Sequence, residues 1–227
     1  MRTPGQDREL TVGFLLTEGV IRSIDDVQSV AHCRSPSDKG LHNSILVELS
    51  PGVELLPGLL ERHTVVSSSC GICGKTSIDA VQSGGISQTQ HQLKISGERL
   101  MLLPHQLRSQ QPGFERTGGV HAAALFDAEG QLFGLCEDVG RHNALDKVLG
   151  KQCLEHGLPL KAVGVMLSGR VSFELIQKAA VAGAEIVVAI GAPSSLAIEL
   201  ASALQITLVG FVRETRLVVY CDAGRVL

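Results

Sequence analysis

The sequence predicts an α/β protein whose larger part is a three-layer αβα structure with a mixed sheet. Aromatic residues make up only 3% of the chain and apolar residues 44%, so the core must consist of Ala, Val, Leu and Ile, which suits closely packed layers of helices and sheet. Apolar runs of strand length alternate with amphipathic helical patterns in the second half of the chain. A β-hairpin pattern precedes this alternation and adds antiparallel strands to a parallel sheet.

The elements of this larger part follow one another from Gly119 onward. Gly119–Phe126 and Gln131–Glu137 are expected strands, joined by a turn, and together they form the hairpin. A helix is expected next, over Asn143–His156, because its apolar residues recur at helical spacing. Its buried set comprises Leu145, Val148, Leu149 and Leu154; the later expected strands are Ala162–Leu167, Glu185–Ile190, Ile206–Val212 and Leu217–Tyr220, and the later helices are Val171–Ala182 and Ser194–Leu204.

The first hundred residues have a less regular pattern. A helix is expected over Glu9–Arg22, with the apolar residues Leu10, Phe14 and Leu15 near one face. Ser44–Leu49 has the alternation of a strand. The change of pattern along the chain therefore predicts a smaller, irregular N-terminal lobe followed by the αβα part.

We divide the chain into a smaller lobe, residues 1–103, and an αβα lobe, residues 104–227. The smaller lobe carries the segment S-S-S-C-G-I-C-G-K, in which Cys70 and Cys73 lie three positions apart among small residues. Lys75 and a helix expected to follow it favour loss of the thiol proton, and the thiolate is the reactive form. The segment therefore predicts sulfur chemistry on a loop.

A zinc site is the alternative interpretation of this cysteine pair. A four-cysteine site needs a second pair at suitable spacing, and the cysteines at positions 33, 136, 153 and 221 are single. The spacing therefore favours reactive thiols and predicts no metal site. Zinc-dependent nucleoside deaminase activity is also disfavoured, because the H-x-E motif of such enzymes carries a proton-transferring glutamate. In this chain His121 is followed by Ala123 at that position.

Composition argues against several other function classes. The net charge is −3 and no long basic run is present, so neither general nucleic-acid binding nor membrane-surface binding is expected. The longest apolar runs, such as Ile186–Ala192, have the length of a strand, far below the roughly 20 residues that span a bilayer. Met1–Asp7 is polar and no apolar signal segment follows it. We therefore expect a cytoplasmic protein.

Polar motifs lie at the ends of several expected strands, one at the start of a strand and the others where a strand meets a helix. The segment T-G-G-V-H-A-A places two glycines beside His121, and E-D-V-G-R-H-N-A-L-D-K carries Arg141. The segment S-G-R-V-S brings Ser168, Gly169 and Arg170 to a helix N-terminus, where N–H groups and a guanidinium favour phosphate or carboxylate. Because such strand ends meet at one edge of the sheet, these residues predict a shared nucleotide-like pocket.

Each of these motifs also has a purely structural interpretation. A single histidine at the start of a strand is more often packed than bound to a ligand. Asn143 can cap a helix, and Asp146 can pair with a neighbouring base. The segment F-V-R-E-T-R is either a charged hairpin turn or a pair of arginines that hold phosphates; its residues are Phe211, Val212, Arg213, Glu214, Thr215 and Arg216.

Taken together, S-S-C-G-I-C-G, T-G-G-V-H-A-A, E-D-V-G-R-H-N-A-L-D-K, S-G-R-V-S and G-A-P-S-S resemble the FdhD family, the formate dehydrogenase accessory sulfurtransferases. The opening V-G-F-L-L-T-E-G-V-I and the closing L-V-G-F-V-R are similar too, so the resemblance covers nearly the whole chain. It implies a cytidine-deaminase-like fold without deaminase activity, in a homodimer. Family chains usually carry a further N-terminal stretch, so this chain is expected to begin late.

The resemblance also implies a function. Family members take sulfane sulfur from a cysteine desulfurase and pass it to the molybdenum cofactor of formate dehydrogenase. This cofactor is the bis-molybdopterin guanine dinucleotide form, whose guanine ends bind like GDP. On this resemblance Cys70 matches the persulfide-forming cysteine, Cys73 its partner, and Phe211 to Arg216 the cofactor segment.

Two alternatives to a sulfurtransferase stay open from the sequence. One is a non-catalytic chaperone that binds the cofactor and delivers it, with thiols that serve only structure. The other is a regulatory domain stabilised by zinc, from which a chelator would remove the metal and the fold together. The sequence identifies neither the desulfurase that donates sulfur nor the formate dehydrogenase that receives it.

Overall fold

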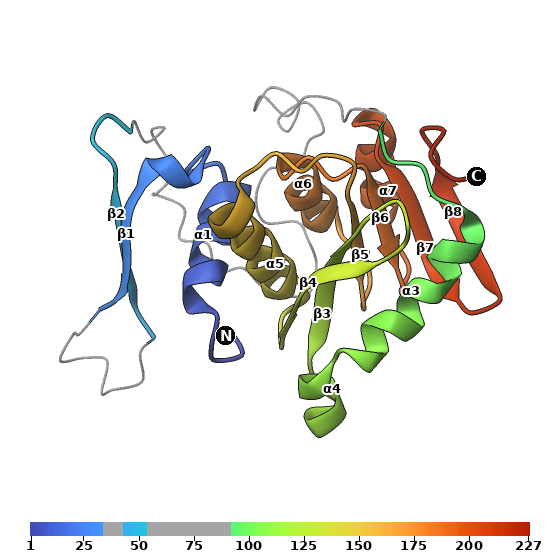
Figure 1. Ribbon diagram of the computed structural model, residues 1–227, viewed down its shortest axis with the longest axis horizontal. Coiled ribbons are helices and arrows are strands. Elements are labelled where there is room, and N and C mark those ends of the chain that lie inside the picture. The colour runs from blue at the N-terminus through green and yellow to red at the C-terminus, as the bar shows by residue number, and fades with distance from the viewer. Residues whose placement is uncertain (34–42, 54–91) are drawn as a thin grey trace.

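A six-stranded mixed sheet forms the centre of the protein in the computed structural model, which describes residues 1–33, 43–53 and 92–227 (Figure 1). The strand order is β4-β3-β5-β6-β7-β8. Neighbours β5, β6 and β7 run parallel, while β3 is antiparallel to both β4 and β5, and β8 is antiparallel to β7. The strands are β3 (His121–Phe126), β4 (Leu132–Asp138), β5 (Gly164–Leu167), β6 (Ile186–Ala189), β7 (Thr207–Arg213) and β8 (Arg216–Cys221).

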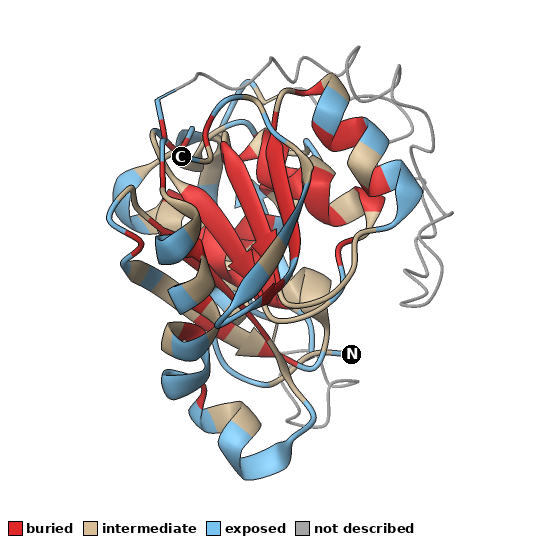
Figure 2. Cartoon of the chain, turned by 90° about the vertical axis from the view of Figure 1, so that its right-hand side faces the viewer, coloured by how far each residue is buried: buried red, intermediate tan, exposed pale blue. Residues whose placement is uncertain are grey.

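Helices cover both faces of this sheet. Residues of β3 alternate between the faces, as a strand requires: Leu125 packs in the cluster formed with α5, α6 and α7, and Phe126 packs in the cluster formed with α3. Figure 2 shows the central strands buried between helices whose outer faces are exposed, whereas the edge strand β8 has no buried residue. The helices are α3 (Gly97–Ser109), α4 (Pro112–Thr117), α5 (Arg141–His156), α6 (Phe173–Val181) and α7 (Ser195–Ala203).

The N-terminal part lies beside this three-layer structure. It contains α1 (Asp7–Thr17), the 3₁₀ helix η1 (Ile24–Asp26) and an antiparallel pair, β1 (Val27–His32) and β2 (Ile45–Leu49). The pair forms a separate sheet next to α1 (Figure 1). A third apolar cluster, built on Val12 and Leu16 of α1, joins this part to α5.

Helices α1 and α5 touch backbone to backbone through two glycines. A Cβ atom at Gly13 would lie 1.9 Å from the carbonyl oxygen of Asp146, and one at Gly150 would lie 1.8 Å from the carbonyl oxygen of Glu9. Real side-chain atoms do not approach so closely, so only glycine fits at either position. The crossing of α1 over α5 therefore depends on these two residues.

The buried face of α1 differs from the expected one. The sequence predicts an apolar face with Leu10, Phe14 and Leu15, whereas Val12 and Leu16 are the buried apolar residues and Phe14 is 37% exposed. Leu15 is partly buried and packs against the same cluster, so the predicted face overlaps the contact stripe only in part, and the helix ends at Thr17 and not at Arg22. Close approach to α5 requires the stripe that contains a glycine, and this stripe is not the most apolar one.

The predicted fold class is confirmed, with the hairpin, the parallel strands and the three helices α5, α6 and α7. Leu145, Val148 and Leu149 are fully buried as expected, whereas Leu154 is only partly buried. The sequence analysis missed β1, α3 and α4; α3 contains Pro104, which is unfavourable inside a helix. The division after residue 103 falls within α3, and the two-lobe division stays a prediction. Among the described helices, none is long and apolar enough to cross a membrane.

Substitution Gly150→Ala tests the helix contact. The added methyl group must displace the backbone of α1, and overpacking of this kind destabilises a protein by about 1–3 kcal/mol or more. We expect the free energy of unfolding, measured with urea, to fall by at least about 2 kcal/mol. Gly97→Ala is the matched control, because the nearest atom to a Cβ there is a leucine methyl at 4.0 Å. Equal stability of the two variants would contradict the contact.

Candidate functional site

The polar strand-end motifs meet at one edge of the central sheet. The carboxyl ends of β4, β5, β6 and β7 and the amino end of β3 lie there, near α4 in Figure 1. Helices α5, α6 and α7 begin at the same edge because each follows one of these strands. The edge therefore brings together His121, Arg141 and the segment 168–170, as the sequence predicts.

Backbone hydrogen bonds join the strand ends to one another. The N–H of Ala122 donates to Ser168 Oγ at 2.8 Å, and the N–H of Ser168 donates to the carbonyl oxygen of Ala122 at 3.0 Å. The N–H of Gly191 donates to Gly169 at 3.1 Å, and that of Phe211 donates to Gly191 at 3.2 Å. The Ser168 hydroxyl thus extends the β3–β5 pairing, and Gly191 connects segment 168–170 to the start of segment 211–216.

The imidazole of His121 lies against Gly169. A Cβ atom at Gly169 would lie 3.1 Å from His121 Nδ1, so a side chain at this position would crowd the ring. Burial lowers the pKa of His121, and the nearby charges of Arg141, Arg170 and His142 lower the pKa further. The ring is therefore held neutral near pH 7, in a positively charged surrounding.

His142 connects the N-termini of α5 and α6. Its Nε2 lies 3.0 Å from Ser172 Oγ and 3.8 Å from Glu174 Oε2, the latter an ion-pair distance and not a hydrogen bond. Interaction with His142, followed by that with Ser172, lowers the pKa of Glu174 to about 2 against the opposing effect of burial. The sequence analysis did not select His142 or Glu174 as site residues. Their only signal was their position inside, or just after, the strand-end motifs.

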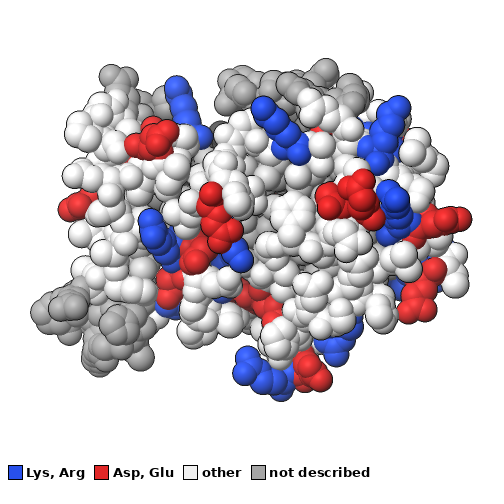
Figure 3. Space-filling model, in the orientation of Figure 1, with Lys and Arg blue, Asp and Glu red and all other residues white. Residues whose placement is uncertain are grey.

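Arg141 and Arg170 are unpaired. Within the described parts of the chain neither guanidinium forms a hydrogen bond or an ion pair, and Arg141 Nε is buried without a partner. Burial lowers the pKa of Arg141 and the nearby charge of Arg170 lowers it further, against the opposing effect of the Glu174 carboxylate; Arg170 itself is exposed. On the face seen in Figure 3, basic and acidic side chains alternate among the described residues.

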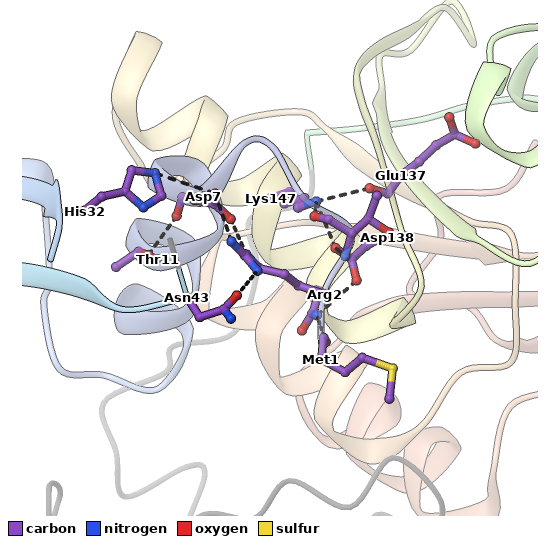
Figure 4. A network of polar contacts seen from close by, with 11 residues as sticks. Met1, Arg2, Asp7, Thr11, His32, Asn43, Glu137, Asp138 and Lys147 are labelled. Atoms are coloured by element: carbon purple, nitrogen blue, oxygen red, sulfur yellow. Dashed lines mark hydrogen bonds and ion pairs between the residues drawn. The ribbon is translucent and has the colours of Figure 1, made fainter. Parts of the chain in front are cut away.

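Glu137 and Asp138, which open the E-D-V-G-R-H-N-A-L-D-K motif, have structural roles. The Glu137 carboxylate accepts the N–H groups of Gly113 and Phe114 at 2.7 and 2.8 Å and so caps α4. Asp138 forms an ion pair with Lys147 at 2.8 Å, and both side chains are almost completely buried. Figure 4 shows this pair beside the N-terminal segment.

Asn143 and Asp146 of the same motif also stabilise the fold. Gly140, not Asn143, is the N-cap of α5, which corrects the predicted capping role. The Asn143 amide instead donates to Asp138 Oδ1 at 3.0 Å and to the carbonyl oxygen of Met1 at 3.0 Å. The predicted pairing of Asp146 with a base is confirmed, because it forms an ion pair with Lys178 at 3.0 Å.

These contacts divide the motif into two sets. Its acidic groups, Asn143 and Lys147 hold the fold together. Arg141 and His142 are left at the strand-end edge, one unpaired and the other bound to α6. The motif therefore contributes two residues to the candidate site.

Segment 211–216 forms the end of β7 and the turn into β8. Phe211 has a positive φ of 50° and is 42% exposed, whereas the side chain of Val212 is buried in the core. Arg213 Nη1 donates to the carbonyl oxygen of Ile190 at 2.8 Å, which folds this side chain back over the sheet edge. Residues 214–216 are exposed. Any ligand of this segment would therefore meet Phe211 and the turn, with Val212 contributing only backbone atoms.

Cys70 and Cys73 lie outside the described residues. Burial raises the pKa of the Cys136, Cys153 and Cys221 thiols, so these three stay protonated and unreactive at neutral pH. In the described ranges, no cluster of three His, Cys, Asp or Glu side chains is arranged to hold a metal ion.

The family model of the FdhD/NarQ family matches residues 1–227. The chain belongs to the FdhD/NarQ family. It is 45% identical over 231 residues to "Sulfur carrier protein FdhD" of Streptomyces coelicolor, covering 100% of this chain and 82% of the relative. It is 39% identical over 226 residues to the protein of the same name from Saccharolobus solfataricus, again covering 100% and 82%.

The fold is similar to that of a solved structure. The crystal structure of a "putative formate dehydrogenase accessory protein" from Desulfotalea psychrophila matches with a TM-score of 0.74 and 24% sequence identity. The match covers 100% of this chain and 82% of that one. At this identity the similarity shows the fold alone, and it agrees with the family assignment.

Glu174→Gln tests the α5–α6 contact through its pH dependence. The pKa of Glu174 lies near 2 in the folded protein, below its ordinary value of 4.5, so its carboxylate stabilises the fold above about pH 4.5 and this contribution is lost as the pH falls toward 2. We expect wild type to be more stable than the variant at pH 6, and the difference to shrink toward pH 2. Thermal unfolding at each pH measures it. A difference that does not depend on pH would show that the carboxylate is not held as described.

Proposed function

We propose that this protein is a sulfurtransferase that accepts persulfide sulfur from a cysteine desulfurase and passes it to the molybdenum cofactor of a formate dehydrogenase. The observation that carries the proposal is the full-length match to the FdhD/NarQ family, with relatives named sulfur carrier protein at 39–45% identity. The Cys70/Cys73 pair supplies the thiols that such a role requires. We further propose that the protein acts in the cytoplasm as a homodimer.

The first step is transfer of sulfur to Cys70. The Cys70 thiolate attacks the terminal sulfur of the desulfurase persulfide, a new S–S bond forms, and the desulfurase cysteine leaves as a thiolate. One S–S bond replaces another, so the step needs no oxidant or reductant. The result is a Cys70 persulfide, with Cys73 as its partner in transfer or as a transient acceptor.

The second step is delivery of sulfur to the cofactor. Conversion of the sulfane sulfur to a sulfido ligand requires two electrons, and a molybdenum(IV) centre supplies them as it becomes molybdenum(VI). The S–S bond of the persulfide breaks, and Cys70 returns to the thiolate. The protein's contribution is to bring its persulfide and the cofactor together, since positioning converts a bimolecular step into an intramolecular one.

The strand-end edge is the proposed site for this cargo. Bis-molybdopterin guanine dinucleotide ends in guanine nucleotides, so GDP is a partial mimic of it. Unpaired arginines beside His121 favour its phosphates, and the exposed turn of segment 211–216 lies next to them through Gly191. Ser168 and Gly169 shape the edge between these two parts.

Cys70→Ala tests the sulfur relay. After incubation of wild type with a cysteine desulfurase and cysteine, we expect an adduct of about 32 Da, one sulfur atom, on the peptide that contains both thiols. The Cys70→Ala variant should lose the adduct and fail to activate formate dehydrogenase, while binding of GDP is retained. Intact-mass spectrometry with peptide mapping measures the adduct.

Cys33→Ser is the matched control, because Cys33 is a partly exposed free cysteine outside the pair; it should load sulfur and activate normally. Normal activation of formate dehydrogenase by a variant lacking both Cys70 and Cys73 would overturn the relay. That result would favour the alternative, a chaperone that carries the cofactor without chemistry.

Arg216→Ala tests the turn of segment 211–216. Arg216 is exposed, and loss of a charge-assisted contact to phosphate weakens binding roughly tenfold. We expect this loss in the affinity for GDP, measured by isothermal titration calorimetry, with unchanged persulfide loading. Lys161→Ala, an exposed cation at the opposite end of β5, should leave the affinity unchanged. If Arg216→Ala and Lys161→Ala lowered the affinity for GDP equally, the cause would be the loss of positive charge anywhere on the protein and not a contact made by the turn.

A further inference from the structure

We propose that Thr3 is a positioning residue for the candidate site, because its hydroxyl fixes the turn between β4 and α5 that precedes Arg141 and His142. The inference rests on the proposed function in one respect, that the strand-end edge binds the cargo. It goes further in giving the N-terminal segment a role in that site. The sequence analysis assigned this segment no such role.

The turn between β4 and α5 has little apolar packing of its own. It consists of Val139 and Gly140, which lie between the last residue of β4 and the first residue of α5. The Val139 side chain is 40% exposed, and Gly140 is the N-cap of α5 without a side chain that could cap the helix. Polar contacts from other parts of the chain therefore determine the conformation of this turn.

Thr3 supplies three polar contacts at this place, one with each of its polar groups. Its hydroxyl oxygen accepts the N–H of Val139 at 2.9 Å. Its own N–H donates to Asp138 Oδ2 at 2.9 Å, and its carbonyl oxygen accepts from Lys147 Nζ at 3.0 Å. The backbone of Thr3 thus contacts the buried ion pair, while its side chain contacts the turn itself.

The neighbours of Thr3 hold it in this place. The carbonyl oxygen of Met1 accepts from the Asn143 amide at 3.0 Å, and Arg2 forms an ion pair with Asp7 at the start of α1. Figure 4 shows Met1 and Arg2 in this network. The position of the Thr3 hydroxyl is therefore set by α1 and α5 and does not depend on the turn alone.

The turn determines where two residues of the candidate site lie. Arg141 is the first residue of α5, directly after the turn, and His142 follows it. The 3.0 Å contact between His142 Nε2 and Ser172 Oγ joins the first turn of α5 to the N-cap of α6. A shift of the turn would move Arg141 and lengthen this contact, and a misplacement of about 1 Å can lower a reaction rate about 100-fold.

A purely structural role of Thr3 is the competing interpretation. In that case loss of the hydroxyl would lower the stability of the fold and leave the site of the folded protein unchanged. The N–H of Val139 lies at an exposed position, so water can replace the lost acceptor, and the stability should change little. The affinity of the folded protein for its cargo therefore distinguishes the two roles.

Thr3→Val tests the positioning role. Valine has nearly the shape of threonine without the hydroxyl, and the backbone contacts to Asp138 and Lys147 remain. We expect the affinity for GDP, measured by isothermal titration calorimetry at a temperature at which all variants are folded, to fall about threefold to tenfold. Thr3→Ser keeps the hydroxyl and should restore the wild-type affinity. The amide signals of Arg141 and His142 in NMR spectra should shift in Thr3→Val and not in Thr3→Ser.

Thr11→Val is the matched control. Thr11 is another partly buried threonine of the N-terminal part, and its hydroxyl donates to the carbonyl oxygen of Asp7 within α1 at 2.7 Å. It should bind GDP as wild type does. An equal loss of affinity in Thr3→Val and Thr11→Val would overturn the positioning role, because it would show a general effect on the N-terminal part.

Two further outcomes separate this inference from the proposed function. If wild type and Thr3→Val bind GDP equally tightly, the positioning role is wrong and the proposed cargo site stands. If wild type does not bind GDP, the proposed cargo site is wrong and Thr3 loses its role with it. Uptake of sulfur by Cys70 should be the same in wild type and in both Thr3 variants, because the hydroxyl acts on the cargo site and not on the thiol.

Discussion

The buried ion pair between Asp138 and Lys147 is the interaction on which the geometry of the site depends. The two side chains are 0% and 1% exposed, and their charged atoms lie 2.8 Å apart. The pair joins the end of β4 to the second turn of α5, and Thr3 donates its N–H to Asp138 and accepts from Lys147 (Figure 4). Loss of one partner would leave an uncompensated charge in the core, at a cost of about 3–5 kcal/mol. Arg141 is the first residue of the same helix, so the ion pair fixes the position of Arg141 relative to β4.

Other buried ion pairs hold the remaining layers in place. Lys178 of α6 pairs with Asp146 of α5 and also donates to Thr17 of α1, while Arg225 pairs with Glu185 at the start of β6. The apolar core around them consists of small aliphatic side chains, whose packing has no directional preference. A buried charge in such a core keeps its ion pair only when the neighbouring helices are in one relative position. We infer that these contacts select the relative positions of helices that the aliphatic core alone would leave less defined.

The site and the fold use the same motifs for opposite purposes. Within a single turn of chain, Asp138 is fully paired and inaccessible, whereas Arg141 lacks a partner. This contrast separates groups that stabilise the fold from groups that we propose bind a ligand. The proposed reaction likewise has two separate tasks: the strand-end edge binds the cargo, and Cys70 carries the sulfur. A substitution at one of these places should therefore affect one task and spare the other.

The sequence by itself determined the layers of the fold and the location of the polar edge. Strand alternation, the hairpin turn and helical spacing are local signals, and parallel strands bring their carboxyl ends together by topology. Only the tertiary structure decided which face of α1 is buried, through Gly13, and that α3 continues through Pro104. It also decided that Glu174 pairs with His142 and that Arg141 stays unpaired. Those outcomes depend on contacts between residues far apart in the chain, and local sequence patterns do not predict such contacts.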